Sequence, residues 1–216
     1  MFRSLLALCL TVPAHLAAHP HIFVDTGFEV ILDETGRLTH IRTTWAYDDY
    51  YSLLITSDMG LDQDYDGVLT DEELEQLTGF DMNWIEGFNG DLVAGLNGEQ
   101  LALSGPSEAT AEFKAGRIIT THLREVEGHP QAVGGKLSLK PYDATYYTAY
   151  DVTLPVTVTG WNACMIENIM PQIGDDLADL QQQLSTLDPN ANPEDVGLSD
   201  PGAAFATDVQ VQCPSS

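Results

Sequence analysis

Apolar and polar residues alternate along the first part of the chain that follows its leading apolar run. Ile22, Val24 and Phe28 have strand-like spacing, and residues 38–45 alternate in the same way. The sequence Asp-Glu-Thr-Gly at residues 33–36 lies between the two runs and is typical of a turn. The pattern therefore predicts a β-hairpin.

The spacing becomes helical after this hairpin. Residues 48–58 place Tyr50, Leu53 and Leu54 on one side of a predicted helix, and a second helix is expected over residues 70–77. An acidic loop lies between the two helices. We therefore expect a helix-loop-helix insert at about residues 48–79.

Short apolar runs separated by turn signals fill most of the remaining chain. Strands are expected over residues 92–96, 100–103, 109–113, 117–126, 136–139, 145–154 and 156–159. An amphipathic helix is predicted over residues 171–187, a loop over 188–202 and a last strand over 206–213. Many short strands with hairpin turns predict a mainly β fold, a β-sandwich-like domain with the helical insert and a C-terminal helix.

The first 18 residues have the features of a cleaved secretory signal. Arg3 precedes an apolar run at residues 5–12, and the segment ends in Leu-Ala-Ala at residues 16–18. The run is too short for a membrane anchor, and we expect no stable anchor elsewhere. The remaining residues 19–216 are expected to form one exported domain, located in the bacterial periplasm or fully secreted.

Charge and cysteine content fit an exported protein that attracts cations. The chain has 33 acidic residues against 8 Lys and Arg, with a net charge of −25 at pH 7. This charge repels phosphate backbones and excludes nucleic-acid binding, whereas metal ions are expected partners. Cys9 is lost with the signal, so one disulfide between Cys164 and Cys213 is the simplest interpretation.

Residues 62–73 have the ligand spacing of an EF-hand loop. Gly67 occupies the sharp turn at position six, and Leu69 at position eight is expected to point inward. Positions one, three, five, seven, nine and twelve hold the expected calcium ligands Asp62, Asp64, Asp66, Val68 (through its carbonyl), Thr70 and Glu73. The alternative is a solvated acidic turn. Because the sequence has no second loop of this pattern, we expect modest affinity and a structural role for Ca²⁺.

Signal cleavage after Ala18 gives the chain a second group of candidate ligands. His19 then carries the free terminal amine, and His21 offers a further ring nitrogen. Pro20 has no backbone N–H to lose, which blocks the square-planar mode that uses deprotonated amides. The amine and imidazoles suit Cu²⁺, Ni²⁺ or Zn²⁺. The alternative is a frayed end followed by an ordinary strand residue.

Three stretches and the acidic loop, in this order, resemble a known bacterial family. The stretches are Ala-His-Pro-His-Ile-Phe-Val-Asp at residues 18–25, Trp-Ala-Tyr-Asp at 45–48 and Lys-Pro-Tyr-Asp-Ala-Thr-Tyr-Tyr at 140–147. The family is a domain of unknown function, DUF1007, often labelled a periplasmic component of an uncharacterised ABC-type transport system. Ala144 stands where members commonly carry Pro, and Cys164 falls where members tend to carry a cysteine.

The resemblance implies an exported accessory protein associated with nickel, cobalt or zinc transport, without an established reaction. It favours His19 and His21 as transition-metal ligands. Asp48 and Asp143 lie in the matched stretches and are the next candidate ligands. His122 and the remaining candidate His129 lack such support, and residues of these kinds usually lie on the surface without a metal.

Three functions remain open from the sequence. The leading hypothesis is a periplasmic metal-binding accessory protein that captures nickel, cobalt, zinc or copper and passes it to a membrane metal transporter. The first alternative is a calcium-stabilised structural or adhesive β module without transition-metal function. The second is a copper-dependent oxidative enzyme, but the chain has no Gly-x-Ser-x-Gly or His-Glu-x-x-His motif, so we do not expect an enzyme.

Overall fold

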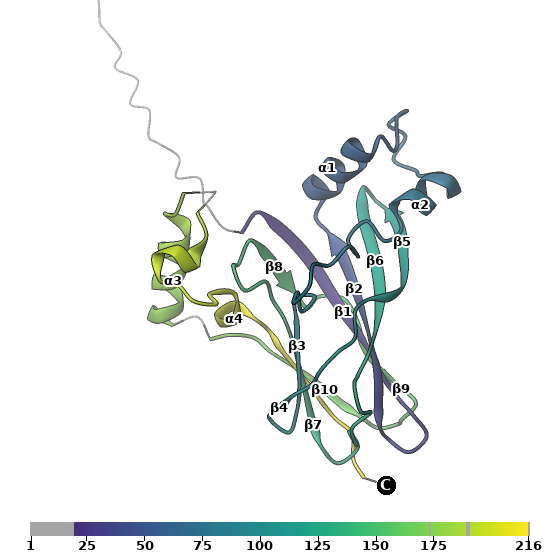
Figure 1. Ribbon diagram of the computed structural model, residues 1–216, viewed down its shortest axis with the longest axis vertical. Helices are drawn as coiled ribbons and strands as arrows, with labels where there is room; N and C mark the ends of the chain where they lie inside the picture. Colours follow the sequence, from purple (N-terminus) through teal and green to yellow (C-terminus); the bar gives the residue numbers. More distant parts are fainter. Residues whose placement is uncertain (1–19, 173, 189–190, 216) are drawn as a thin grey trace, which may run out of the picture.

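Two β-sheets pack face to face and diverge toward one end, where two helices stand on the first sheet (Figure 1). The computed structural model describes residues 20–172, 174–188 and 191–215. The predicted signal at residues 1–18 and the candidate ligand His19 lie outside the described residues. The fold is mainly β and sandwich-like, as the strand pattern predicts.

The first sheet is built around the predicted hairpin. Strand β1 pairs antiparallel with β2, which pairs antiparallel with β6, and the short strands β8 and β9 both pair parallel with β1. The sheet has the order β5-β6-β2-β1-β8, with β9 beside β1. Its strands are β1 (Ile22–Leu32), β2 (Leu38–Tyr47), β5 (Ser107–Lys114), β6 (Arg117–Glu125), β8 (Thr148–Asp151) and β9 (Val156–Thr159).

The second sheet combines the middle of the chain with its C-terminal end. Its order is β10-β11-β7-β3-β4. Its strands are β3 (Leu92–Leu96), β4 (Glu99–Gln100), β7 (Lys136–Pro141), β10 (Met165–Ile169) and β11 (Asp208–Gln212). A disulfide between Cys164 and Cys213 joins the residue before β10 to the residue after β11, which confirms the predicted pair.

Alternation along the strands forms the core between the sheets. Phe28 and Val30 of β1 face Leu137 and Leu139 of β7 and Val209 of β11 in one buried cluster. β10 was not predicted because all of its residues are exposed, so an edge strand of this kind leaves no alternating signal in the sequence.

The described helices are α1 (Asp49–Met59), α2 (Asp71–Leu77), α3 (Asp175–Ser185) and α4 (Gly202–Phe205), with a 3₁₀ turn η1 (Pro193–Val196). The helices predicted over residues 48–58 and 70–77 are confirmed as α1 and α2. Asp48 caps α1 by accepting from the Tyr51 N–H, and Gly60 ends it with φ 68°. The segment 188–202 was predicted as a loop but contains η1 and the beginning of α4.

α1 and α2 are attached to the end of the first sheet by leucines on both sides of the acidic loop. Leu61, Leu69 and Leu77 are buried in a cluster with Val24 of β1 and Ile118 of β6. Leu69 therefore points inward, as its loop position predicts. Tyr50, Leu53 and Leu54, which the helical spacing placed on one side of this helix, are exposed to solvent.

Among the residues that the structure describes, no helix is both long enough and apolar enough to cross a membrane.

Truncation of Leu77 tests this attachment. Because its side chain is fully buried between α2 and the sheet, Leu77→Ala should lower the free energy of unfolding by about 3 kcal/mol. Leu54→Ala makes the same truncation at a leucine that is 44% exposed, and should lower the free energy of unfolding by about 0.5 kcal/mol or less. Urea unfolding measures both changes. Equal costs for the two variants would show that α2 is not held by this leucine.

Candidate metal centre

The acidic loop brings three carboxylates together. Asp62, Asp64 and Asp66 each offer a ligand oxygen, and these oxygens lie within 4.8 Å of one another. Two oxygens bound to one Ca²⁺ at 2.3–2.6 Å are at most about 5 Å apart, so the spacing fits a shared calcium ion. Within the described ranges this is the one group of three or more His, Cys, Asp or Glu side chains arranged in this way.

Backbone N–H groups of the loop donate to the side chains of its aspartates. The Gly67 N–H donates to Asp62 Oδ1 at 3.2 Å, and the Val68 N–H donates to Asp66 Oδ1 at 2.8 Å. Gly67 has φ 77°, a conformation that strongly favours glycine, while Tyr65 adopts φ 57°. Neither of these two bonds involves Asp64. The turn predicted at Gly67 is therefore present.

Glu73 connects the two ends of the loop. Its Oε1 accepts from the Asp62 N–H at 2.9 Å, and its Oε2 accepts from the Thr70 N–H at 2.8 Å and from Thr70 Oγ1 at 2.9 Å. These bonds lower the pKa of Glu73, led by the Thr70 backbone donor. Glu73 is thus held beside Asp62 but is not part of the group of three aspartates.

The other two predicted calcium ligands, Val68 and Thr70, lie just before the second helix. Thr70 is the N-cap of α2, and its hydroxyl also accepts from the Glu73 N–H. Val68 has an exposed side chain. The roles of the Val68 carbonyl, Thr70 and Glu73 as calcium ligands stay predictions.

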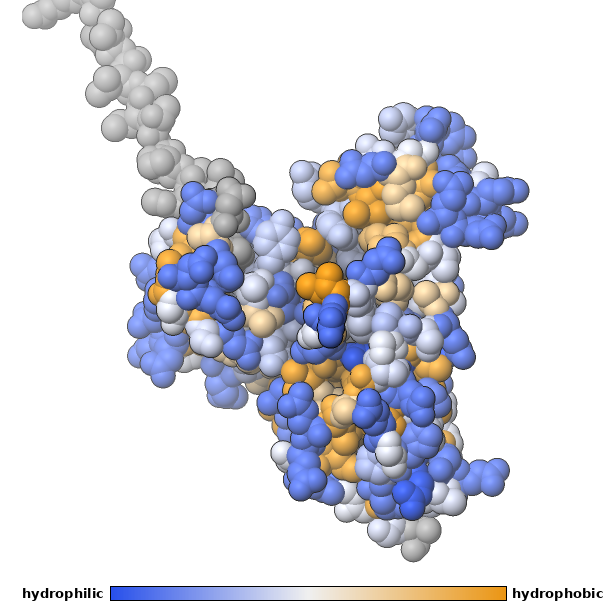
Figure 2. All heavy atoms as spheres, in the orientation of Figure 1, coloured by the Kyte–Doolittle hydropathy of each residue, from blue (hydrophilic) through white to orange (hydrophobic). Residues whose placement is uncertain are grey.

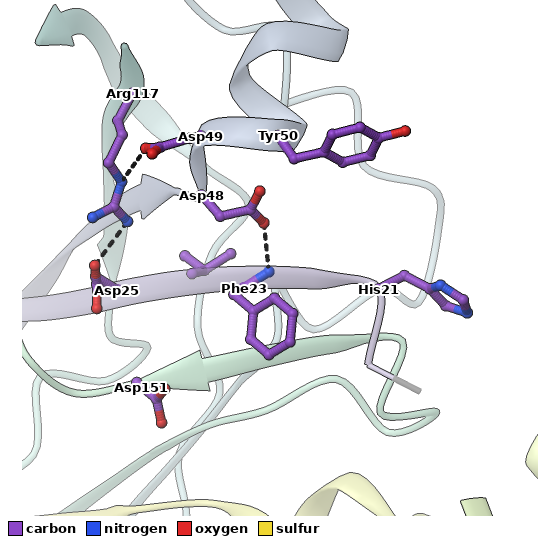
Figure 3. Close-up of a pocket in the computed structure, with 9 residues that line it drawn as sticks. His21, Phe23, Asp25, Asp48, Asp49, Tyr50, Arg117 and Asp151 are labelled. Carbon is purple, nitrogen blue, oxygen red and sulfur yellow. Dashed lines mark hydrogen bonds and ion pairs between the residues drawn. The ribbon is translucent and has the colours of Figure 1, made fainter. Parts of the chain in front are cut away.

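The second predicted metal set lies partly in an open pocket of about 580 Å³ at the start of α1 (Figure 3). His21 and Asp48 both line it, together with the carboxylates Asp25, Asp49 and Asp151. Arg117 pairs with Asp25 at 2.7 Å and approaches Asp49 at 4.0 Å. The pocket is therefore acidic with one bound cationic side chain.

The two predicted carboxylate ligands of this set already accept hydrogen bonds. Asp48 accepts from the Tyr51 and Phe23 N–H groups at 2.8 and 2.9 Å. Asp143 accepts from the Thr145 N–H and hydroxyl through Oδ1 and from the Thr148 N–H through Oδ2. Asp143 does not line the pocket. The structure thus brings His21 and Asp48 to one pocket but not Asp143.

Comparison with known protein families matches residues 4–213 to the family described as "Protein of unknown function (DUF1007)". The chain belongs to the DUF1007 family. A search of curated proteins found no match. The resemblance seen in the sequence is therefore confirmed at the level of the family.

The remaining histidine candidates of this DUF1007 protein have different surroundings. His129 lies on the surface and contacts Glu125 Oε1 at 3.0 Å. His122 was expected on the surface, but it is 1% exposed and lies between the rings of Trp45 and Trp84, with centroids 4.6 and 5.3 Å away. Burial, and then the charges of nearby arginines, lower the pKa of His122 to about 3. His122 is therefore neutral at physiological pH.

Sequence reasoning also missed two partly buried carboxyl groups, those of Asp81 and Asp91. Asp81 accepts from Tyr47 Oη at 2.8 Å and from Thr120 Oγ1 at 2.7 Å, and burial raises its pKa. Asp91 accepts from Tyr150 Oη at 2.7 Å. No spacing rule links residues so far apart in the chain; both aspartates lie in turns outside the strands, and tertiary packing brings them to their partners.

Burial and the charge of Asp143 outweigh the Tyr150 hydrogen bond and raise the pKa of Asp91 from 3.8 to about 7. The folded protein therefore keeps a proton that the unfolded chain loses as pH rises through this range. Asp91 therefore lowers the free energy of unfolding progressively as pH rises from about 4 to about 7, by at most about 4 kcal/mol.

Asp91→Asn keeps an acceptor for Tyr150 and removes this titration. Relative to the unchanged protein, the variant should gain stability as pH rises, with the difference small near pH 4 and largest above about pH 7. Urea unfolding at both ends of the range measures it. An equal difference at both pH values would show that Asp91 does not titrate in the folded protein.

Proposed function

We propose that this DUF1007 member is an exported metal-binding protein whose acidic loop takes Ca²⁺. The observation that carries the proposal is the group of Asp62, Asp64 and Asp66, with ligand oxygens within 4.8 Å. Calcium, bound here, supplies positive charge and oxygen coordination. The signal-like first 18 residues and the Cys164–Cys213 disulfide support export to an oxidising compartment.

The role of the ion is structural. Two carboxylates at this separation repel by about 1 kcal/mol in water and by about 3 to 4 kcal/mol at an effective dielectric constant of 20. Leu61 immediately before the loop and Leu69 within it are both buried against the sheet. Neutralising the aspartates therefore stabilises the same turn that lets these leucines pack. Calcium fastens α1 and α2 to the first sheet.

The acidic pocket favours a second metal function. His21 shares it with Asp25, Asp48, Asp49 and Asp151. Cleavage after Ala18 would make His19, two residues before His21, the first residue of the chain. Imidazole and terminal amine nitrogens select copper, nickel or zinc over calcium. Capture of such an ion and its delivery to a membrane metal transporter is the accessory role that the pocket supports.

The calcium site is tested by Asp64→Asn, because Asp66 and Asp62 also hold the loop backbone. The unchanged protein should bind Ca²⁺ with a Kd of about 0.1–1 mM. At about 10 mM Ca²⁺ this should add about 2 kcal/mol to the free energy of unfolding. Asp64→Asn should weaken binding by at least about tenfold and remove most of the gain.

Isothermal titration and thermal unfolding measure both quantities. Glu75→Gln, which removes one charge from the exposed side of α2, is the matched control and should bind normally. No heat and no rise in Tm in the unchanged protein at about 10 mM Ca²⁺ would overturn the calcium proposal.

The transition-metal function is tested separately on protein that begins at His19. Titration with Zn²⁺, Ni²⁺ and Cu²⁺ should give at least one Kd tighter than about 10 µM. His21→Ala should weaken that binding by at least about tenfold, while the surface control His129→Ala should not. Circular dichroism checks that each variant is folded. Binding that is unchanged in His21→Ala would contradict a site at the amino terminus.

A further inference from the structure

Helix α1 is inverted relative to an ordinary surface helix. Its fully buried side chains are the small polar Ser52 and Thr56, at 0% and 4% exposure, and the partly buried Tyr51 and Ile55 pack beside them. Its large side chains Tyr50, Leu53 and Leu54 are 74%, 59% and 44% exposed. A surface helix normally shows the opposite arrangement, with its apolar stripe against the core.

Small residues on the inner side let α1 lie close to the first sheet. Ser52 Oγ accepts from the Ile118 N–H at the beginning of β6 at 3.0 Å, and Thr56 Oγ1 donates to the Ser52 carbonyl at 3.0 Å. The inner side is therefore held by short hydrogen-bonded side chains together with the partly buried Tyr51 and Ile55. Tyr50, Leu53 and Leu54 contribute little to this attachment, so the fold does not explain why they are apolar.

The exposed apolar stripe formed by Tyr50, Leu53 and Leu54 lies between two surface pockets. Tyr50 lines the acidic pocket together with Phe23, which is 50% exposed. Leu53 lines a second cavity of about 440 Å³ with Gly60, Leu61 and Tyr65. α1 has 11 residues, and a helix of this length extends about 16 Å. Figure 2 shows hydrophobic side chains gathered on this helical pair.

Carboxylates border the stripe on both sides and at its end. At about 100° per residue, Asp49 and Asp58 fall on opposite sides of Tyr50, Leu53 and Leu54. Asp62 lines the second cavity, and the chain as a whole has a net charge of −25. The surface is thus an apolar strip with an acidic rim.

The charge decides between possible occupants. An anionic membrane surface and a second copy of this chain would both place negative charge against negative charge. A partner segment with apolar residues beside Lys or Arg would pair both parts of the surface. The length of the strip and its i, i+3, i+4 spacing match the apolar face of a short amphipathic helix.

We propose that the exposed face of α1, formed by Tyr50, Leu53 and Leu54 and continued by the cavity at Tyr65, is a docking surface for a basic amphipathic helix of a partner protein. An apolar side chain of the partner occupies the cavity beside Leu53. Its basic residues meet Asp49 and Asp58. Both aspartates lie in α1, outside the group of Asp62, Asp64 and Asp66, so this docking does not depend on the calcium proposal.

The probe is a labelled synthetic peptide of about 14 residues with leucines at helical spacing and lysines elsewhere. Comparison peptides replace every lysine by glutamate, or keep the composition and scramble the order. Fluorescence anisotropy with the full mature chain at physiological salt measures binding. The ordered basic peptide should bind at least about tenfold tighter than the scrambled one, and the acidic peptide should not bind.

Two double variants separate docking from general charge attraction. Tyr50→Ser/Leu53→Ser should weaken binding of the ordered basic peptide by at least about tenfold. The control Ile85→Ser/Val196→Ser removes side chains that are 79% and 56% exposed elsewhere, and should leave binding unchanged. All four positions are exposed, so both variants should keep the unfolding midpoint of the unchanged protein.

Several results would overturn the proposal. These are equal binding of ordered and scrambled peptides, an equal loss in both double variants, and no loss in Tyr50→Ser/Leu53→Ser. Flotation with anionic phosphatidylglycerol vesicles that depends on Tyr50 and Leu53 would assign the face to a membrane instead. Concentration-dependent dimerisation that the same variant abolishes, seen by sedimentation velocity, would assign it to a second copy.

Discussion

The acidic loop has to satisfy two opposed requirements within one turn of chain. Leu61 and Leu69 must point into the cluster beneath the helical pair, where they are 5% and 7% exposed. The same turn directs Asp62, Asp64 and Asp66 toward one another. Burial of the leucines stabilises the conformation, while repulsion between the carboxylates opposes it. Under the proposed function a bound cation would remove the opposition, which would make loop conformation, helix attachment and metal binding depend on one another.

The arrangement of α1 follows from the same attachment. The loop and α2 supply the buried leucines, while α1 contacts β6 through Ser52 and packs its partly buried Tyr51 and Ile55 on the same cluster. Its larger apolar residues are then available on the outside, between the acidic pocket and the loop. The helical pair therefore carries both features that we propose for contact with other molecules, the candidate cation site and the apolar face with an acidic rim.

Local patterns predicted the parts of the structure that depend on neighbours in the chain. The β1–β2 hairpin, both helices of the insert, the turn at Gly67 and the inward direction of Leu69 all follow from spacing within about a dozen residues. The Cys164–Cys213 pair followed from counting cysteines in an exported chain. The burial of His122, the Asp91–Tyr150 bond and the exposed face of α1 depend on strand register and on how the insert lies, which local spacing does not contain.

Amide hydrogen exchange with and without calcium shows whether the ion holds the helical pair in place, because exchange reports opening of the loop and of α2 separately from the sheets. Millimolar Ca²⁺ should slow exchange in the loop at residues 62–70 and in α2, and should leave the central strands β2 and β7 unchanged. Exchange in the loop and α2 that is the same in both conditions would contradict this role of calcium, since the ion would then not fasten the helical pair.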